Sequence, residues 1–263
     1  MSLDSAKRIT FSQRVHNAVE SFSTQVSSLS RRLQKHFQEP PPTPFRRELI
    51  LSLTTLQTGI LDAATFTTYG IFVGNMTGNV VFLGLAISGL YNNSIIPSII
   101  ALASFFFGGW ITGLFDRIAH QREKGYPRFF YVLFTIFHSI VYFIAAALIY
   151  TSVIPQGNQD NSRLGLFVLL AVGQGSQIVV TKKAGLPEFT TNVITSTIAD
   201  LSADLDPVHL ERGWRSKLRR VASVVSLLLG AIIGGYVFGR EGFGITLFLA
   251  GGISGLIALG WGL

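Results

Sequence analysis

Long uncharged runs of hydrophobic residues occupy most of the chain after residue 48. The longest covers residues 63–115, and four more cover residues 129–159, 164–181, 221–239 and 242–263. A helix of about 20 apolar residues crosses the hydrocarbon core of a bilayer, so the longest run suffices for two crossings. The pattern therefore predicts an all-α integral membrane protein whose function lies within the bilayer.

Lys and Arg residues cluster in short segments between these runs. They occur in residues 1–47, 116–128, 182–183 and 211–220, whereas residues 91–94 contain none. Cytoplasmic loops of membrane proteins are enriched in Lys and Arg. We therefore expect the four basic segments and both termini to lie in the cytoplasm.

Two further apolar segments, at residues 71–90 and 189–201, upset the count of crossings. If each crossed the membrane, the basic segments before and after it would lie on opposite faces. Both segments also carry Asn, Thr or Ser residues, which interrupt their hydrophobic pattern. Non-helical backbone is tolerated in a membrane only where protein surrounds it or where it lines a cavity. We therefore expect two re-entrant or broken segments.

About six full spans remain, and they divide into two similar halves. The expected spans lie near residues 49–68, 95–115, 129–151, 164–181, 221–239 and 242–262. Each half, about 48–151 and 164–262, has a span, a polar-interrupted segment and two more spans. Three crossings per half place the halves in opposite orientations, which is the inverted repeat of many transporters. A weak likeness between residues 75–79 and 193–197, and between Gly59 and Gly175, agrees with this interpretation.

Residues 1–47 form a separate basic region. Hydrophobic residues recur there every three or four positions, as in an amphipathic helix. They are Phe11, Val15, Ala18, Phe22, Val26, Leu29, Leu33 and Phe37. A proline-rich linker, with Pro40, Pro41, Pro42 and Pro44, follows. The region is expected to lie on the anionic inner leaflet, to contact another helix, or to be a mobile tail without a specific partner.

Composition excludes several other classes of protein. Hydrophobic residues make up 48% and charged residues 13%, against roughly 25% charged in soluble domains. The net charge of +7 is spread between the apolar runs, so we expect no nucleic-acid partner. The chain has no cysteine, and it has no Gly-rich nucleotide loop, Gly-x-Ser-x-Gly or His-Glu-x-x-His motif. We expect a protein that is not an enzyme and that holds no cofactor or metal.

One stretch of the chain resembles a known family. It reads Gly59-Ile-Leu-Asp62-Ala63, and then Tyr69-Gly70-Ile-Phe-Val-Gly74-Asn75-Met76-Thr77-Gly78-Asn79-Val-Val-Phe-Leu-Gly84. With residues 190–201, it is similar to the YoaK-like family of uncharacterised multi-pass membrane proteins (domain of unknown function 1275), in a fungal-type form with a basic N-terminal tail. The likeness covers about residues 48–260. It departs at Ser196, where glycine is expected, and at Ser176-Gln177, where a Gln-Asn pair is expected. The resemblance implies a multi-pass membrane fold and brings no established substrate.

Asp62 is the most informative single residue, because it lies within the first expected span. A carboxylate there costs ~2.5–3.5 kcal/mol on insertion scales, so it is expected to face a cavity or a partner. Two interpretations are open. Asp62 couples protons or cations to transport, which we take as the working hypothesis, or it is a hydrogen-bonded structural residue.

The interrupted segments supply most of the other candidates. Asn75, Thr77 and Asn79 offer amide and hydroxyl groups that suit a small solute or ion. Alternatively they bond to neighbouring helices, since glycines four residues apart in this segment suit close packing. The complete set of candidate path residues is Asp62, Asn75, Thr77, Gly78, Asn79, Gln177, Asn192, Thr195, Ser196 and Asp200.

Three remaining polar features have simpler explanations. Asp200 either attracts cations at a cytoplasmic mouth or pairs with Arg212 and Arg215, and pairing is the favoured interpretation. Gln177 either lines a pore or bonds between helices. His138 is expected to be a neutral, buried imidazole rather than a ligand.

The sequence predicts a carrier or channel for an unidentified small solute, formed where residues 71–85 and 189–200 meet. Asp62 would couple protons, and the polar residues of both segments would line the path. The expected partners are the lipid bilayer and this solute, and a homo-oligomer is compatible with the pattern. The alternative is a membrane scaffold that does not transport and acts through its N-terminal region.

Overall fold

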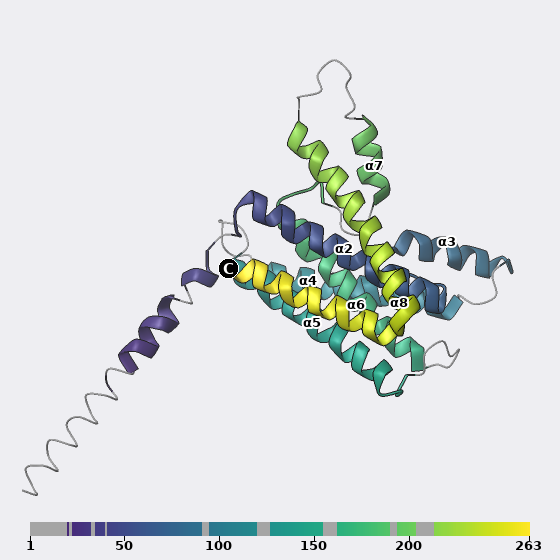
Figure 1. Ribbon diagram of the computed structural model, residues 1–263, viewed down its shortest axis with the longest axis horizontal. Helices are drawn as coiled ribbons and strands as arrows, with labels where there is room; N and C mark the ends of the chain where they lie inside the picture. Colours follow the sequence, from purple (N-terminus) through teal and green to yellow (C-terminus); the bar gives the residue numbers. More distant parts are fainter. Residues whose placement is uncertain are drawn as a thin grey trace, which may run out of the picture.

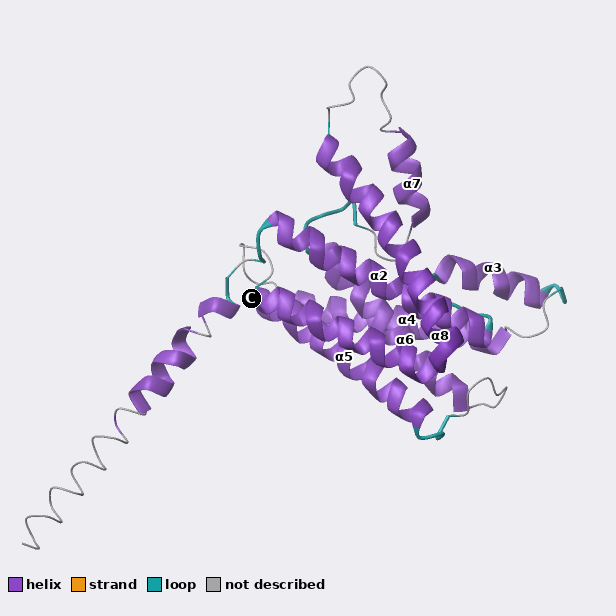
Figure 2. Ribbon diagram, in the orientation of Figure 1, coloured by secondary structure: helices purple, strands orange, loops and turns teal. Residues whose placement is uncertain are grey.

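The computed structural model describes residues 20, 23–32, 35–39, 41–90, 95–119, 127–154, 162–189, 194–203 and 213–263. Within these ranges the regular secondary structure is entirely helical, as predicted (Figure 2). The N-terminal region is helical at residues 23–32, where Val26 and Leu29 are exposed. The other residues of the predicted apolar stripe lie outside the described ranges, apart from Phe37, whose ring packs against that of Phe129.

The first span is α2 (Pro44–Tyr69). Pro44 stands at its first turn, where a missing N–H costs little because no carbonyl within the helix would accept it. The helix ends at Gly70, which has the left-handed conformation (φ 71°, ψ 18°) that glycine adopts readily. There the N–H of Gly70 donates to the carbonyl oxygen of Phe66.

After Gly70 the chain runs back in a non-helical segment and then enters a short helix. Residues 71–75 are non-helical, and α3 (Met76–Ile87) follows with Asn75 as its N-cap. The side-chain oxygen of Asn75 accepts the N–H of Gly78 at 3.3 Å. The 12 residues of α3 extend about 18 Å, which is too short to cross a hydrocarbon core of about 30 Å.

Three further long helices and a second short one follow. They are α4 (Ile95–Ala119), α5 (Arg128–Tyr150), α6 (Ser162–Lys183) and the 10-residue α7 (Ile194–Ala203). The long helices start and end within a few residues of the predicted spans. Like α3, α7 falls within a polar-interrupted segment and is too short to span.

The last helix, α8 (Trp214–Gly262), is interrupted at Gly242. Gly242 has φ 83° and ψ 179°, a backbone conformation essentially restricted to glycine. Here the chain turns sharply, so that the first arm of α8 (residues 214–241) and the second arm (residues 243–262) diverge from the break like the two sides of a V (Figure 1). Five described helices are long and apolar enough to span a membrane, and the break gives α8 two spans, so the described helices provide the six predicted.

Several charged helix ends lie at one end of the bundle, which we call the basic end. Lys183 Nζ lies 2.9 Å from Asp116 Oδ2, joining the ends of α6 and α4. Arg219 Nε donates to Glu48 at 2.7 Å, joining the starts of α8 and α2. Because these helices start or finish here in alternation, the chain crosses the bundle an even number of times between successive basic segments.

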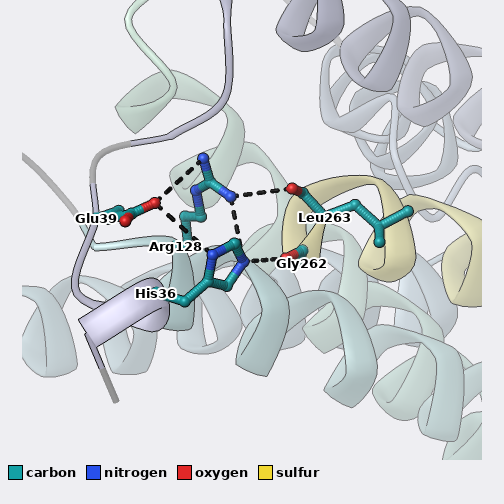
Figure 3. Close-up of polar contacts among 5 residues, drawn as sticks. All are labelled: His36, Glu39, Arg128, Gly262 and Leu263. Atoms are coloured by element: carbon teal, nitrogen blue, oxygen red, sulfur yellow. Dashed lines mark hydrogen bonds and ion pairs between the residues drawn. The ribbon is translucent and has the colours of Figure 1, made fainter. Parts of the chain in front are cut away.

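The last residues of the chain reach the same end. Arg128, at the start of α5, donates to the carbonyl oxygen of Leu263 at 3.1 Å (Figure 3). His36 Nε2 lies 2.6 Å from the carbonyl oxygen of Gly262, and Glu39 lies 3.7 Å from Arg128. The N-terminal region before α2 and the end of α8 therefore lie on one side of the bundle, as an even number of spans requires.

Two helix crossings are close enough to require glycine. Where α2 crosses the first arm of α8, a Cβ atom at Gly59 would overlap the Leu227 carbonyl oxygen, and one at Gly230 would overlap that of Leu56. Small residues at such crossings let helix backbones approach in membranes.

The crossing of α4 and α6 repeats this arrangement. A Cβ atom at Gly175 would overlap the Phe105 carbonyl oxygen, and one at Gly108 would overlap that of Val172. In both crossings each glycine faces the carbonyl three residues before the partner glycine. The two pairs of helices therefore pack in the same way.

The outer surface of the bundle is apolar. Large hydrophobic side chains such as Phe106 and Ile118 on α4, Ile140 on α5 and Leu228 and Leu256 on α8 are exposed. An exposed apolar surface of this extent indicates contact with lipid rather than water. Fold and surface together confirm the predicted class, an all-α integral membrane protein.

Candidate substrate pocket

A pocket of about 420 Å³ lies where the two polar-interrupted segments meet. Its walls come from α2, residues 72–77, the start of α7 and the first arm of α8. The polar lining residues are Asp62, Thr67, Asn75, Thr77 and Thr195. Sites for small molecules typically enclose roughly 300–1,000 Å³ with a few polar groups in a mostly apolar wall. The pocket is thus the size of a site for a small metabolite.

Asp62 holds the non-helical segment against α2. Its Oδ1 atom accepts the N–H groups of Val73 at 3.0 Å and Gly74 at 2.7 Å. Asp62 lies about two turns before the end of α2, so the chain after Gly70 runs back by that distance along the helix. The segment therefore enters the bundle from the end opposite the basic end. Helix α3 then runs out again toward that same end.

The second short helix has the opposite direction. Thr195 places the start of α7 at the pocket, while Asp200, one turn further along, lies 4.0 Å from Arg220 near the start of α8. The chain after α7 continues into α8, which starts at the basic end. The two short helices therefore leave one pocket toward opposite ends of the bundle.

Asn79 and Gly78 shape the segment without lining the pocket. Asn79 is fully buried, and its amide both accepts from the N–H of Phe72 at 2.9 Å and donates to the carbonyl oxygen of Phe72 at 2.6 Å. A Cβ atom at Gly78 would lie 2.8 Å from the Phe72 ring. For Asn79, the alternative role of internal hydrogen bonding therefore matches the geometry.

Stacked aromatic rings form one wall of the pocket. The Phe66 and Phe72 rings are parallel within 10°, with centroids 4.7 Å apart, and both residues line the pocket. The ring of Phe82, on α3, lies 6.0 Å from that of Phe72. This stack joins the end of α2, the non-helical segment and α3 into one unit.

The remaining predicted path residues lie elsewhere. Ser196 and Asp200 are exposed on α7 and are not among the pocket-lining residues, and Asn192 lies outside the described residues. Asp200 lies 4.0 Å from Arg220 rather than pairing with Arg215, and the other predicted partner, Arg212, lies outside the described residues. Gln177 is buried between α2 and α6, bonded to Thr58, and does not line the pocket.

A buried polar network connects α2, α5 and α6 beside the pocket. Gln177 Nε2 donates to Thr58 Oγ1 at 2.8 Å, and Gln174 Nε2 donates to the Tyr142 hydroxyl at 2.9 Å. Thr58 Oγ1 lies 3.3 Å from Gln174 Oε1. Thr58 and Tyr142 were not among the predicted candidates, although the four-residue spacing of Thr54, Thr58 and Asp62 places these polar groups on one face of α2.

His138 is a satisfied core residue, in line with its simpler explanation. It is buried, and its Nε2 atom lies 3.0 Å from Ser176 Oγ, which in turn accepts from Thr112 at 2.8 Å. Among the described residues, no three His, Cys, Asp or Glu side chains are close enough to share a metal ion.

These features define a polytopic membrane protein with six spans, two short helices that meet at a pocket, and one carboxylate in the pocket wall. The chain belongs to the family described as "Protein of unknown function (DUF1275)", whose profile matches residues 50–260. It is 28% identical over 193 residues to the UPF0700 transmembrane protein YoaK of Bacillus subtilis (strain 168). The aligned residues make up 71% of this chain and 82% of that protein. No solved structure matches the chain.

Proposed function

We propose that this protein carries a small polar solute across the membrane through the pocket at Asp62. The observation that supports this most directly is the meeting of two broken segments, one from each half of the chain, at a single pocket. Transporters build their sites in this way, since interrupted helices expose backbone groups near the middle of the bilayer. A carrier and a channel both fit this geometry.

The two halves are proposed to be an inverted repeat. In this arrangement α2 corresponds to α6 and α3 to α7. Helix α4 then corresponds to the first arm of α8, and α5 to the second arm. The reciprocal glycine crossings support it, because Gly59 and Gly230 hold the places of Gly175 and Gly108. The contacts agree as well, since α3 packs on α4 as α7 packs on α8.

The lining of the pocket favours a neutral or cationic solute. Among the described lining residues, the only charged side chain is that of Asp62, and the other polar groups are three hydroxyls and one amide. A carboxylate in a wall of low dielectric constant attracts cations and disfavours anions. Small amines, amino acids and polyols are therefore the classes to test.

Asp62 is proposed to couple protons to movement of the segment at residues 71–75. As a carboxylate it accepts two backbone N–H groups from this segment. Hydrogen bonds to a charged acceptor are roughly twice as strong as neutral ones, so protonation would loosen the segment from α2. The proton would thus change the shape of the pocket as well as its charge.

The basic end is proposed to face the cytoplasm. It carries Arg128, Lys183 and Arg219 at the ends of spanning helices, and the positive-inside rule assigns such an end to that side. Both the N-terminal region and the end of α8 would then be cytoplasmic.

Uptake by purified protein in proteoliposomes tests the proposal. A panel of labelled amines, amino acids and polyols is compared between wild type, Asp62→Asn and Asp200→Asn. We expect uptake of at least one class, a loss of at least tenfold in Asp62→Asn, and little change in Asp200→Asn, whose carboxylate lies outside the pocket. Equal uptake by all three, or uptake no greater than by empty vesicles across the whole panel, would contradict the proposal.

A further inference from the structure

A second, much smaller cavity lies between the pocket and the basic end. It encloses about 10 Å³ among α2, α5, α6 and the second arm of α8. Its polar lining residues are Thr54, Gln57, Thr135, His138, Gln177 and Thr181. A cavity of this size holds about one water molecule when polar groups surround it.

Gln177 provides the reason for a water molecule to be there. Its side chain is only 2% exposed, and its Nε2 atom is used by the bond to Thr58. Its Oε1 atom has no hydrogen-bond partner among the described residues. Buried amide oxygens are almost always bonded, to protein or to ordered water, because leaving them unpaired is costly.

The network of Thr58 and Gln174 links this cavity to the pocket. Both side chains converge on Gly74, where a Cβ atom would lie 3.0 Å from Thr58 Cγ2 and 3.1 Å from Gln174 Oε1. Asp62 Oδ2 would lie 3.0 Å from the same Cβ. Because the Thr58 atom nearest Gly74 is a methyl carbon, the polar groups continue from the carboxylate past Gln174 Oε1 to Thr58 Oγ1, and from there to Gln177 at the cavity.

An aromatic pair closes the cavity toward the basic end. Trp261 lines the cavity, and its ring stacks on that of Tyr131 with centroids 4.4 Å apart and planes within 19°. The Tyr131 hydroxyl donates to the carbonyl oxygen of Lys183 at 2.7 Å. Because both rings are almost fully buried, they separate the cavity from the charged residues beyond.

We propose that this cavity is a second site on the transport path, nearer the basic end than the pocket, and that it holds a water molecule on Gln177 Oε1. The stacked rings of Tyr131 and Trp261 form the gate that closes it. This inference rests on the proposed function only in assigning the gate a role in transport. Water in the cavity is a separate claim and is measured separately. In the conformation described here the pocket admits the solute as far as Asp62. The narrower route from Asp62 to the small cavity at Gln177 admits only water.

Hydroxyl-radical footprinting by synchrotron radiolysis tests for the water in the wild-type protein. Radicals formed from bound water label adjacent side chains, even buried ones. We expect modification of Trp261 and His138, although both are almost fully buried, and no comparable modification of Phe167 and Phe243, which are equally buried and line neither cavity. Gln177→Leu should lower the labelling of Trp261 severalfold. Labelling of Trp261 and His138 no greater than that of the two phenylalanines would overturn the water site.

Osmotic water permeability of proteoliposomes tests the gate. Trp261→Ala removes the stacked ring and should raise the permeability severalfold above wild type, whereas Trp261→Phe preserves a ring over Tyr131 and should stay close to it. If folded Trp261→Ala matches wild type, the gate is wrong. The outcome is distinct from a failure of the proposed function, because that failure appears as absent solute uptake with the water labelling still present.

Discussion

The crossing of α2 with the first arm of α8 and the crossing of α4 with α6 share one packing arrangement and differ in chemistry. Both have reciprocal glycines, each against the carbonyl three residues before the other. Three residues after its glycine, however, α2 has Asp62, whereas α6 has Ile178 after Gly175. Close packing thus repeats in the two halves, and the charge occurs in one.

The comparison separates what holds the bundle together from what makes the site. Among the described residues, the α2 crossing alone has a carboxylate that holds a non-helical segment, and the pocket lies on that side. At the other crossing the polar groups, Thr112, Ser176 and His138, bond to one another in the interior. The same close packing therefore occurs at two crossings, of which one borders the pocket.

The largest loss of stability is expected when a side chain replaces a glycine at either helix crossing. Gly108→Val and Gly230→Val should each destabilise the protein by about 3 kcal/mol or more, because the added carbons overlap backbone of the partner helix. Gly113→Val and Gly235→Val, on the same helices with open space around them, should be nearly neutral. Thermal unfolding in detergent measures all four. Similar losses at the control positions would show that the crossings do not carry the packing.

The next effect distinguishes the anchoring role of Asp62 from its charge. Asp62→Ala removes the acceptor of two backbone N–H groups and should cost about 2–3 kcal/mol, while Asp62→Asn retains an oxygen there and should cost less. The same measurement, with Asp200→Ala as control, tests this. Equal stability of the alanine and asparagine variants would mean that the carboxylate does not hold the segment.

A smaller effect is expected within the segment itself. Asn79→Ala leaves both backbone polar groups of Phe72 without their partner and should cost about 2 kcal/mol, whereas Asn75→Ala removes a helix cap worth about 1 kcal/mol. Solute uptake should fall more in the Asn75 variant, since only Asn75 lines the pocket. The reverse order of uptake would assign the path role to Asn79.

The smallest loss of stability is expected at the basic end, where helices from both halves of the chain meet. Lys183→Gln breaks the contact with Asp116 and should cost less than about 1 kcal/mol, because the ammonium group is partly exposed and water screens it. High salt should remove most of the difference from wild type. A cost that salt leaves unchanged would indicate that Lys183 contributes through packing of its stem instead.

The sequence predicted the spans well because each is an apolar run that must satisfy its own backbone hydrogen bonds in lipid. The break between the last two spans was expected near residue 240 and lies at Gly242, where a conformation restricted to glycine is needed. It was harder to separate Asn75 from Asn79, since both are amides in one polar segment. Which of them faces a cavity depends on how α3 lies against Phe72.

The sequence by itself determined that the protein is helical, lies in a membrane, and has most of its basic residues at one end, because hydrophobicity and loop charge are local properties of the chain. Only the tertiary structure decided which of the predicted path residues share the pocket, among them Asp62, Thr77 and Thr195, and that Gln177 instead faces a separate cavity beside Trp261. These placements depend on where glycines allow helices to cross, and helices that approach each other there come from distant parts of the chain.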